Sequence, residues 1–371
     1  MRTPLHTELK NGDPSLLSHQ GYLDSFFVHR MISVGGFGQV FEAISADGEE
    51  VAVKVESLKA TVQLLANEAA CLRSLNRSWN AQGEPQKEPF LRYYGYGNNQ
   101  DVRYIAMEKC GENLRDLKKK TEFDRFSIKT SLWIMHKMLN ALHTMHSEGW
   151  LHRDVKPANF CIGLKDQRAM FVIDFGMSRC YIASDGSVKT RKPHSSFHGT
   201  IRYVSTHIHK REDASRWDDL WSLLYIGIEN MCGRLPWRHV NDKNEVMKMK
   251  EAFQPTDLKY GAEHYPPHSV TVFYNHLLSA KLKIEEYFYF PPPYSWFFSE
   301  LSTDLSRRGS NSLDAVQLDW MKTEIDEPKV IQNSTYVADI MATPKKSRAR
   351  HPLGDIQNRP IHQLDRSVCF Y

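Results

Sequence analysis

Residues 151–160 of this chain read LHRDVKPANF, and this stretch decides how the rest of the sequence is interpreted. It places a carboxylate at Asp154, an ammonium group at Lys156 and an amide at Asn159 around a rigid proline. An aspartate in a rigid loop can accept a proton from an incoming hydroxyl group. A nearby lysine can offset charge that develops on a transferring phosphoryl group, and an asparagine can offer a neutral oxygen to a divalent cation. A charged surface loop is the alternative, but it does not explain this order of residue types.

A second carboxylate follows at the end of an apolar strand, in the stretch FVIDFGMSR at residues 171–179. Hard cations such as Mg²⁺ favour carboxylate ligands and keep several waters. Asp174 and Asn159 could therefore form a two-ligand magnesium site. For Asp174 alone, an ordinary position in a tight Asp-Phe-Gly turn is the alternative.

Two further features lie upstream of these carboxylates. Residues 32–43, ISVGGFGQVFEA, form a glycine-rich turn between two predicted strands. Glycines let backbone N–H groups approach phosphates closely, although a plain hairpin turn fits the same residues. Lys54 lies in the apolar strand VAVKVE, where a lone ammonium is costly, so we expect a partner such as Glu68 on the following helix. A lysine whose head reaches solvent and a glutamate on a solvated helix face are the alternatives.

The spacing of apolar residues divides the chain into a strand-rich first third and a helical remainder. Alternating patterns bounded by glycine-containing turns predict strands at 26–33, 39–45, 49–57 and 102–110. Helical spacing predicts helices over 64–75 and 127–148, with Gly149 as the C-terminal cap of the second. Residues 219–233 are apolar on nearly all sides, which is typical of a helix buried at the centre of a lobe.

The composition is that of an ordinary globular protein of 371 residues, with a formal net charge of +4 and a pI near 8.6. This mild basicity does not indicate dedicated nucleic-acid binding. No apolar run reaches the roughly 18 residues of a membrane span, so we expect no membrane association. Six cysteines without a C-x-x-C pair indicate free thiols in a reducing compartment, and no zinc site.

The two ends of the chain differ from the region between them. Residues 1–21 are polar and interrupted by prolines, and we expect a flexible leader without the apolar block of a signal peptide. Apolar density falls after residue 321, and we expect residues 322–371 to be a basic, disordered tail. The segment KKSRAR at 345–350 fits either a localisation patch or simple solubility. We expect a cytoplasmic protein, and this segment leaves a nuclear location open.

The joint order of these features resembles the protein kinase pattern of a glycine-rich loop, a strand lysine, a helix glutamate, H-R-D-x-K-x-x-N and D-F-G. The resemblance covers residues 22–321 and implies an α+β, bilobal kinase fold, with an N-lobe over about 22–108 and a C-lobe over about 112–321. It implies ATP and Mg²⁺ as cofactors, and transfer of the γ-phosphate to Ser or Thr hydroxyls of protein substrates. A pseudokinase-like scaffold that binds nucleotide or partner proteins without turnover is the alternative, although the lysine and both key aspartates are present.

Details of the sequence narrow the resemblance further. Lys156 and Thr200 stand where serine/threonine kinases place a lysine and a threonine close to the catalytic aspartate. Residues 199–238 lack the usual A-P-E signature and resemble the casein kinase 1 superfamily, with its G-T-x-R-Y-x-S segment and L-P-W motif. The stretches LPWRHVNDKNEVMKMKE at 235–251 and LDWMK at 318–322 look like the tau-tubulin kinase branch.

The resemblance assigns catalytic roles to the matching residues of this sequence. Asp154 corresponds to the catalytic base, and Lys156 to the cation that contacts the transferring phosphate. Asn159 and Asp174 correspond to the Mg²⁺ ligands. Asp219, at the start of the apolar helix, corresponds to a structural anchor for the catalytic loop.

The same resemblance places the nucleotide. Lys54 is expected to hold the α- and β-phosphates of ATP and to pair with Glu68. Met107 is expected at the back of the adenine pocket, with backbone groups of Glu108 and Cys110 facing the adenine edge. The remaining expected nucleotide contacts lie on the glycine-rich loop and its flanking strands: Ile32, Ser33, Val34, Gly35, Gly36, Phe37, Gly38, Val40 and Ala52.

The sequence departs from the family pattern at two positions of interest. The first glycine of the G-x-G-x-x-G loop is Ser33, with Gly35 and Gly38 at the other two, so we expect at most a reduced nucleotide affinity. His198, in FHGT, replaces a family arginine that binds phosphorylated or acidic substrates, and a histidine is only partly charged near neutral pH. A nearby basic cluster could still favour acidic substrates, although a solvated loop fits it equally: Lys189, Arg191, Lys192 and Arg202.

Regulation is the last expectation from the sequence. Hydroxyl residues between D-F-G and G-T-x-R-Y could be phosphorylated and could then order this loop through Arg153: Ser187, Thr190, Ser195 and Ser196. Members of this superfamily are generally active without such phosphorylation. We therefore expect constitutive activity, and a monomer.

Overall fold

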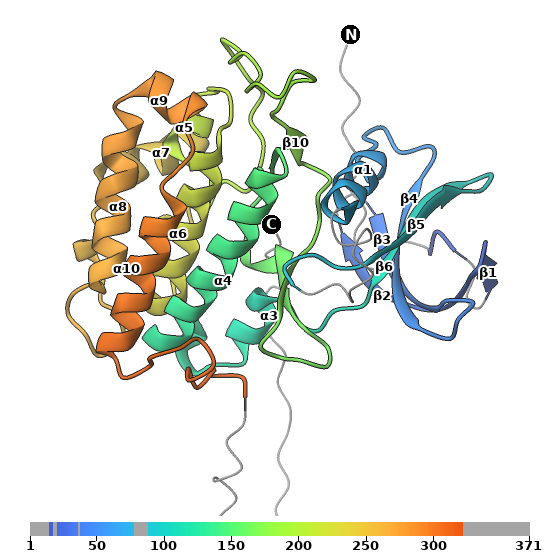
Figure 1. Ribbon diagram of the computed structural model, residues 1–371, viewed down its shortest axis with the longest axis horizontal. Coiled ribbons are helices and arrows are strands. Elements are labelled where there is room, and N and C mark those ends of the chain that lie inside the picture. The colour runs from blue at the N-terminus through green and yellow to red at the C-terminus, as the bar shows by residue number, and fades with distance from the viewer. Residues whose placement is uncertain (1–14, 18–20, 36–37, 78–87, 322–371) are drawn as a thin grey trace, which may run out of the picture. The chain divides into compact units, whose positions relative to one another are not determined.

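The computed structural model describes residues 15–17, 21–35, 38–77 and 88–321, which lie within one compact unit. Figure 1 shows a smaller lobe built on a β-sheet, coloured blue to cyan, and a larger helical lobe, coloured green to orange. The predicted α+β fold with two lobes is confirmed. The predicted tail, residues 322–371, lies outside the described residues.

The smaller lobe is an antiparallel sheet with one helix. Its six strands lie in the order β1-β2-β3-β4-β6-β5, and α1 follows β4 in the chain. Its elements are β1 (Gly21–Leu23), β2 (Phe26–Gly35), β3 (Gly38–Ile44), β4 (Glu50–Ser57), α1 (Leu65–Leu75), β5 (Tyr93–Asn98) and β6 (Val102–Glu108).

Alternation along β4 decides which side chains reach the larger lobe. Val51, Val53 and Val55 are fully buried in the core of the smaller lobe. Ala52 and Lys54 lie between them in sequence and therefore point to the other face of the sheet. Ala52 joins the main hydrophobic core of the molecule there. The strand pattern thus places Lys54 on the face that looks toward the larger lobe.

The larger lobe is mainly helical, with two small two-stranded sheets near its boundary with the smaller lobe. Its elements are α3 (Leu114–Lys119), η1 (Glu122–Asp124), α4 (Ile128–Ser147), β7 (Trp150–Leu151), η2 (Pro157–Asn159), β8 (Phe160–Ile162), β9 (Met170–Val172), β10 (Arg179–Cys180), α5 (Thr206–His209), α6 (Arg216–Cys232), α7 (Lys243–Ala252), η3 (Pro255–Asp257), α8 (His268–Lys281), α9 (Ile284–Tyr289) and α10 (Tyr294–Arg307).

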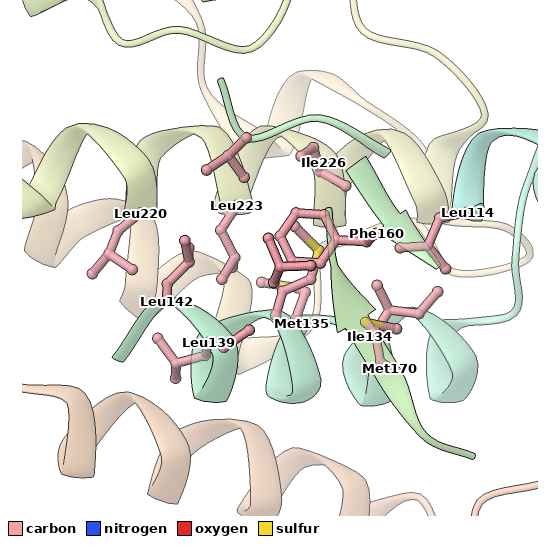
Figure 2. Packing of buried hydrophobic residues seen from close by; sticks show 14 of the residues in the cluster. Leu114, Ile134, Met135, Leu139, Leu142, Phe160, Met170, Leu220, Leu223 and Ile226 are labelled. Atoms are coloured by element: carbon pink, nitrogen blue, oxygen red, sulfur yellow. The ribbon is translucent and has the colours of Figure 1, made fainter. Parts of the chain in front are cut away.

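Helices α4 and α6 form the centre of the larger lobe. Figure 2 shows Leu142 of α4 beside Leu223 of α6, and both side chains are fully buried. The two helices approach closely at Gly227, where a Cβ atom would lie only 2.3 Å from the sulfur of Met135. This tight packing gives the catalytic region a rigid base.

The buried helix predicted over 219–233 is confirmed, with a start three residues earlier. The side chains of Ser215 and Asp218 cap its first turn reciprocally, which fixes the start at Arg216. Gly233 ends it in the left-handed conformation, with φ of +82°. Every residue of α6 except Cys232 is buried.

The described structure reaches both ends of the predicted kinase region. Trp320 packs edge-on against Phe126, with ring centroids 5.6 Å apart, so the packed structure extends at least to this residue. Near the other end, the Leu16 N–H donates to the side chain of Gln39 at 2.7 Å. Residues 15–17 of the predicted leader therefore lie against the sheet, and the rest of 1–20 lies outside the described residues.

Some elements are not predicted by sequence pattern alone. The strand β5 reads YYGYGN, and its two glycines hide the alternation of a strand. The helix α3 has only six residues, too few for a clear helical repeat. Along the described residues, no helix is both long and apolar enough to cross a membrane.

Candidate active site

A buried carboxylate holds the loop 151–160 in place. Asp219 of α6 is 3% exposed and accepts the backbone N–H groups of His152 and Arg153, each at 2.9 Å. His146 of α4 adds a contact from Nε2 at 2.9 Å. Burial acts to raise the pKa of Asp219, but the contacts with His146 and His152 together outweigh it, and the pKa lies below its usual value. The predicted anchoring role of Asp219 is confirmed.

The Asp154 carboxylate has a donor on each oxygen. Thr200 Oγ1 donates to Oδ1 at 2.7 Å, and Lys156 Nζ donates to Oδ2 at 2.6 Å. Asp154 is only 8% exposed, so these contacts, rather than solvent, set the direction of the carboxylate. The predicted contact between Thr200 and this aspartate is confirmed.

Asn159 joins the loop to the segment that carries Asp174. Its side-chain Nδ2 donates to the Asp154 carbonyl oxygen at 3.0 Å, and its own carbonyl accepts the Ile173 N–H at 2.9 Å. Because the amide nitrogen is used in this way, Oδ1 of Asn159 is left as an acceptor for a cation. Asp174, which follows Ile173, has φ of +66°. Aspartate adopts this left-handed backbone conformation more readily than most residues do.

This pair of oxygen ligands fits Mg²⁺. Magnesium is usually bound by one or two carboxylates together with waters and substrate phosphates, rather than by a complete protein cage. In the part of the chain that the structure describes, no group of three or more His, Cys, Asp or Glu side chains could hold a metal ion. Asp174 and Asn159 supply one carboxylate and one amide oxygen, a donor set that fits a magnesium ion bound mainly by phosphates and waters.

Lys54 of β4 forms ion pairs with a carboxylate of each lobe. Its Nζ lies 2.6 Å from Glu68 Oε2 of α1 and 2.9 Å from Asp174 Oδ1. Burial acts to lower the pKa of Lys54, but the two carboxylates outweigh it and raise the pKa above its usual value. Burial likewise acts to raise the pKa of Asp174, and Lys54 nevertheless lowers it to about 2. The predicted Lys54–Glu68 pair is confirmed, and Asp174 completes the cluster.

Aromatic packing fixes the direction of the Asp-Phe-Gly turn. Phe175 is 2% exposed, and its ring packs against Phe90 and His152 with centroid distances of 6.1 and 5.9 Å. Because Phe175 occupies this interior site, the preceding Asp174 is directed to Lys54. The turn therefore has the orientation that brings its carboxylate to the Lys54 ammonium.

The predicted adenine-pocket residues gather where β4 and β6 meet the segment that joins the lobes. Ala52 lies opposite Met107 in the strand register, and both are buried. The Glu108 side chain accepts the Arg92 N–H at 3.1 Å, so it is turned toward β5 and does not line this pocket. Cys110 is half-buried and follows directly in the connecting segment.

The glycine-rich loop is described on both sides of its tip, while Gly36 and Phe37 lie outside the described residues. Ile32 is exposed, Val34 is half-buried and Val40 packs against the main core. Ser33 is exposed opposite Val40, and its φ lies outside the left-handed region, so its Cβ causes no backbone strain.

The third glycine of the loop is constrained more tightly. Gly35 and Gly38 pair across the hairpin. A Cβ atom at Gly38 would lie 2.6 Å from the carbonyl oxygen of Val55. The structure therefore tolerates a side chain at Ser33 but requires a glycine at Gly38.

His198 does not present a cation to a substrate. It is 6% exposed, and its Nδ1 contacts the Ser196 carbonyl at 2.9 Å. Burial and the nearby Arg153 lower its pKa below the usual value, so the ring is neutral at physiological pH. Much of the basic cluster nearby also has partners within the chain: Lys189 with Cys180, Arg191 with Glu212, and Arg202 with Glu229.

The sequence alone does not reveal how the segment after D-F-G is held. Arg179 pairs with Asp213 through both terminal guanidinium nitrogens, Nη1 and Nη2. Asp213 also accepts the Lys192 N–H at 3.0 Å. Arg153 donates from Nε to the Met177 carbonyl at 2.7 Å. Asp213 lies 34 residues from Arg179 in sequence, and no local pattern marks the two as partners.

Comparison with known proteins identifies the family. Residues 26–287 match the protein kinase domain family, and this match covers more than half of the chain. The chain therefore belongs to the protein kinase family. Membership implies the use of ATP, typically with a divalent metal ion.

Named relatives define the class more closely. A probable serine/threonine-protein kinase of Dictyostelium discoideum is 36% identical over 256 residues, which are 68% of this chain and 49% of that protein. Casein kinase I homolog 3 of Schizosaccharomyces pombe is 30% identical over 308 residues, which are 79% of this chain and 64% of that protein. The chain thus spans between about half and two thirds of the length of these relatives. The predicted class, a serine/threonine protein kinase, is confirmed at the level of the kinase domain.

Proposed function

We propose that this chain is an active serine/threonine kinase that transfers the γ-phosphate of ATP to hydroxyl groups of protein substrates. One observation carries the proposal. The Asp154 carboxylate, oriented by Lys156, is joined through Asn159 to the segment that carries Asp174 of the Lys54–Glu68–Asp174 cluster. A proton acceptor and a proposed phosphate-binding cluster are therefore held together.

In the proposed mechanism, Asp154 orients the substrate hydroxyl and accepts its proton. Thr200 and Lys156 hold the carboxylate so that its oxygens are directed before the substrate arrives. The Lys156 ammonium also offsets negative charge on the phosphoryl group in transfer. Little covalent work is required of the protein, because phosphoryl transfer depends mainly on alignment and charge neutralisation.

The opposite side of the cleft is proposed to hold Mg-ATP. Lys54 would bind the α- and β-phosphates, and Asn159 and Asp174 would hold the metal ion. Held there by Asn159 and Asp174, Mg²⁺ would neutralise negative charge on the phosphates of ATP. Glu68 keeps the Lys54 ammonium directed into the cleft, because its 2.6 Å contact fixes the end of a flexible side chain.

We propose that the segment after D-F-G is ordered without phosphorylation. The Asp213 carboxylate pairs with Arg179. In kinases that are switched by phosphorylation, a phosphate on this loop makes the corresponding contact with an arginine. Replacing the four candidate hydroxyl residues, Ser187, Thr190, Ser195 and Ser196, by alanine is then expected to leave activity in place. Loss of activity in that variant would contradict constitutive action.

We also propose a substrate class and a branch of the kinase family for this chain. Protein substrates with Ser or Thr acceptors follow from the kinase class. We place the chain in the casein kinase 1 superfamily, close to the tau-tubulin kinase branch, on the motifs of residues 199–238 and 318–322. The name of the Schizosaccharomyces relative supports the superfamily.

The test is transfer of labelled phosphate from Mg-ATP to casein, followed by phosphoamino-acid analysis. We expect phosphoserine or phosphothreonine, and no transfer in a parallel reaction with excess chelator. A folded protein that binds Mg-ATP but transfers no phosphate to casein or other protein substrates would contradict the proposal. It would favour the scaffold alternative instead.

A further inference from the structure

A buried lysine on α7 reaches the residues that follow Thr200. Lys250 is only 3% exposed, although lysine side chains are almost never buried unless they have partners. Its Nζ donates to the carbonyl oxygens of Ile201 at 2.7 Å and Val204 at 2.6 Å. The lysine therefore joins α7 to residues that lie 49 and 46 positions earlier in the chain.

The surroundings of Lys250 strengthen these contacts. Its Nζ lies 5.2 Å from the ring centroid of Tyr225 and 5.5 Å from that of Trp237, and both rings are buried. Hydrogen bonds are electrostatically stronger in such a water-poor environment. Burial also lowers the pKa of Lys250 well below its usual value. The ammonium and the neutral amine both have two hydrogens to donate, so either form can bind the two carbonyls.

Other side chains hold the carbonyls between these two. Trp237 Nε1 donates to the Arg202 carbonyl at 2.8 Å, and Ser222 Oγ donates to the Tyr203 carbonyl at 2.9 Å. Each carbonyl oxygen of the segment 201–204 therefore accepts a donor from α6, α7 or the L-P-W motif. The segment lies outside any helix or strand, so its position depends on these side chains.

The position of this segment controls the Asp154 carboxylate. Thr200 immediately precedes the segment, and its Oγ1 donates to Asp154 Oδ1 at 2.7 Å. The Thr200 carbonyl accepts the N–H groups of Tyr203 and Val204, at 2.9 and 3.1 Å. These hydrogen bonds tie Thr200 to the segment, so a shift of the segment moves the threonine hydroxyl relative to Asp154.

We propose that Lys250 and Trp237 are positioning residues for phosphate transfer. By fixing the carbonyls of the segment 201–204, they keep the Thr200 hydroxyl on Asp154 and the carboxylate directed at the substrate hydroxyl. This role rests on the proposed kinase function. It also gives the stretch around the L-P-W motif a task at the site, since both side chains come from that stretch.

A lysine that only stabilises the larger lobe is the alternative. Lys250→Met separates the two roles, because methionine is also unbranched and flexible but cannot donate a hydrogen bond. The substitution leaves two carbonyls without their donor, so both roles predict a lower melting temperature. Only the positioning role predicts that the folded variant also turns over more slowly.

The kinetic test uses the full-length chain with casein as substrate, at a temperature where every variant is folded. Lys250→Met should lower kcat about tenfold and change Mg-ATP affinity by less than about twofold. Thr200→Val acts on the same carboxylate, so the double variant should be within about threefold of the slower single variant. Independent effects would instead multiply to about 100-fold, and that result would overturn the proposal.

Two further variants complete the comparison. Trp237→Phe removes the donor to the Arg202 carbonyl but keeps an aromatic ring, so it tests the same segment even where Lys250→Met does not fold. Its kcat should fall about threefold. Tyr260→Phe is the matched control, because the fully buried tyrosine donates to the Pro255 carbonyl at 2.9 Å, outside the segment. It should lose stability and keep its kcat, and an unchanged kcat in Trp237→Phe as well would overturn the proposal.

Hydrogen–deuterium exchange provides a readout that does not require turnover. The N–H groups of Tyr203 and Val204 should exchange at least about threefold faster in Lys250→Met and Trp237→Phe than in the wild type, and at the wild-type rate in the control. Unchanged exchange in both variants would overturn the proposal. A wild type that transfers no phosphate would contradict the proposed function, whereas faster exchange in the variants would still support the hold on the segment.

Discussion

Glu68 and Asp219 are two equally buried carboxylates, 2% and 3% exposed, and the protein shifts their pKa values in opposite directions. Burial raises the pKa of Glu68, and the charge of Lys54 only partly offsets this. At Asp219, burial acts in the same sense, but the contacts with His146 and His152 together reverse the shift and lower the pKa. The same burial therefore produces opposite results because the partners differ.

The partners explain the contrast. Asp219 accepts two backbone N–H groups and a histidine, all from the larger lobe, and none of these donors has a long flexible side chain. The charged partner of Glu68 is the ammonium of Lys54, which it shares with Asp174 of the other lobe. We infer that the catalytic loop is fixed permanently on Asp219, whereas the nucleotide side is held by a cluster that can separate when the lobes move.

The largest expected effect comes from Lys54→Met. The substitution leaves two facing carboxylates without their cation, so phosphate transfer should fall at least about 100-fold and the free energy of unfolding should fall by about 3 kcal/mol. In the wild type, the Asp174 pKa of about 2 lies below the usual 3.8, so its stabilising contribution is present above pH 3.8 and is lost as pH falls toward 2.

In the variant, Glu68 dominates the pH dependence. Burial already raises the Glu68 pKa in the wild type, and without Lys54 that pKa should rise further, so the variant should gain more stability than the wild type as pH falls from 7 to about 5. Urea denaturation at several pH values measures this. Lys109→Met is the matched control, because Lys109 also pairs with two carboxylates, Glu42 and Glu50. These are 15% and 56% exposed, whereas Glu68 is 2% exposed, so the loss should cost about 1 kcal/mol or less. Equal losses in the two variants would contradict the cluster's role.

Asp219→Asn tests the other side of the comparison. The amide can accept only one of the two backbone N–H groups and presents its own donors to the other, so the loop should lose about 3 kcal/mol of stability and activity should fall about 30-fold. Asp304→Asn is the control, because Asp304 is 4% exposed and accepts the Ser269 N–H at 2.9 Å in a region outside the cleft. It should lose similar stability with little change in turnover, and a parallel loss of turnover would argue against a specific anchor.

Thr200→Val should have an intermediate effect. It removes the donor to Asp154 Oδ1 with little change in size, so kcat should fall about tenfold while the KM for ATP stays nearly constant. Thr200→Ser keeps the hydroxyl and should recover most of kcat. A change confined to the KM for ATP would place Thr200 on the nucleotide side and contradict this assignment.

The smallest effect is expected at the glycine-rich loop. Ser33→Gly should change the KM for ATP by less than about twofold, because the serine is exposed and unstrained. Gly38→Ala, in the same hairpin, should destabilise the protein by about 2 kcal/mol, because its Cβ would contact the Val55 carbonyl. Steady-state kinetics and thermal unfolding of the two variants measure this difference. A large gain of activity in Ser33→Gly would show that the serine limits the wild type.

Much of the site follows from sequence because its residues sit in short fixed motifs. The loop 151–160, the Asp-Phe-Gly turn and the strand lysine each carry a local signature, and the structure brings them together. His146 and Asp213 could not be predicted in the same way. Their partners lie 73 and 34 residues away, and only the tertiary packing of the larger lobe brings them into contact.

The most direct measurement compares wild type with Asp154→Asn for both Mg-ATP affinity and turnover on casein. Asparagine keeps the size of the side chain and an oxygen for Thr200, but it cannot accept a proton. The account predicts that kcat falls at least about 100-fold while Mg-ATP affinity changes by less than about twofold. Retention of more than about a tenth of the turnover, or a parallel loss of nucleotide affinity, would contradict the division between a catalytic loop and a nucleotide-binding cluster.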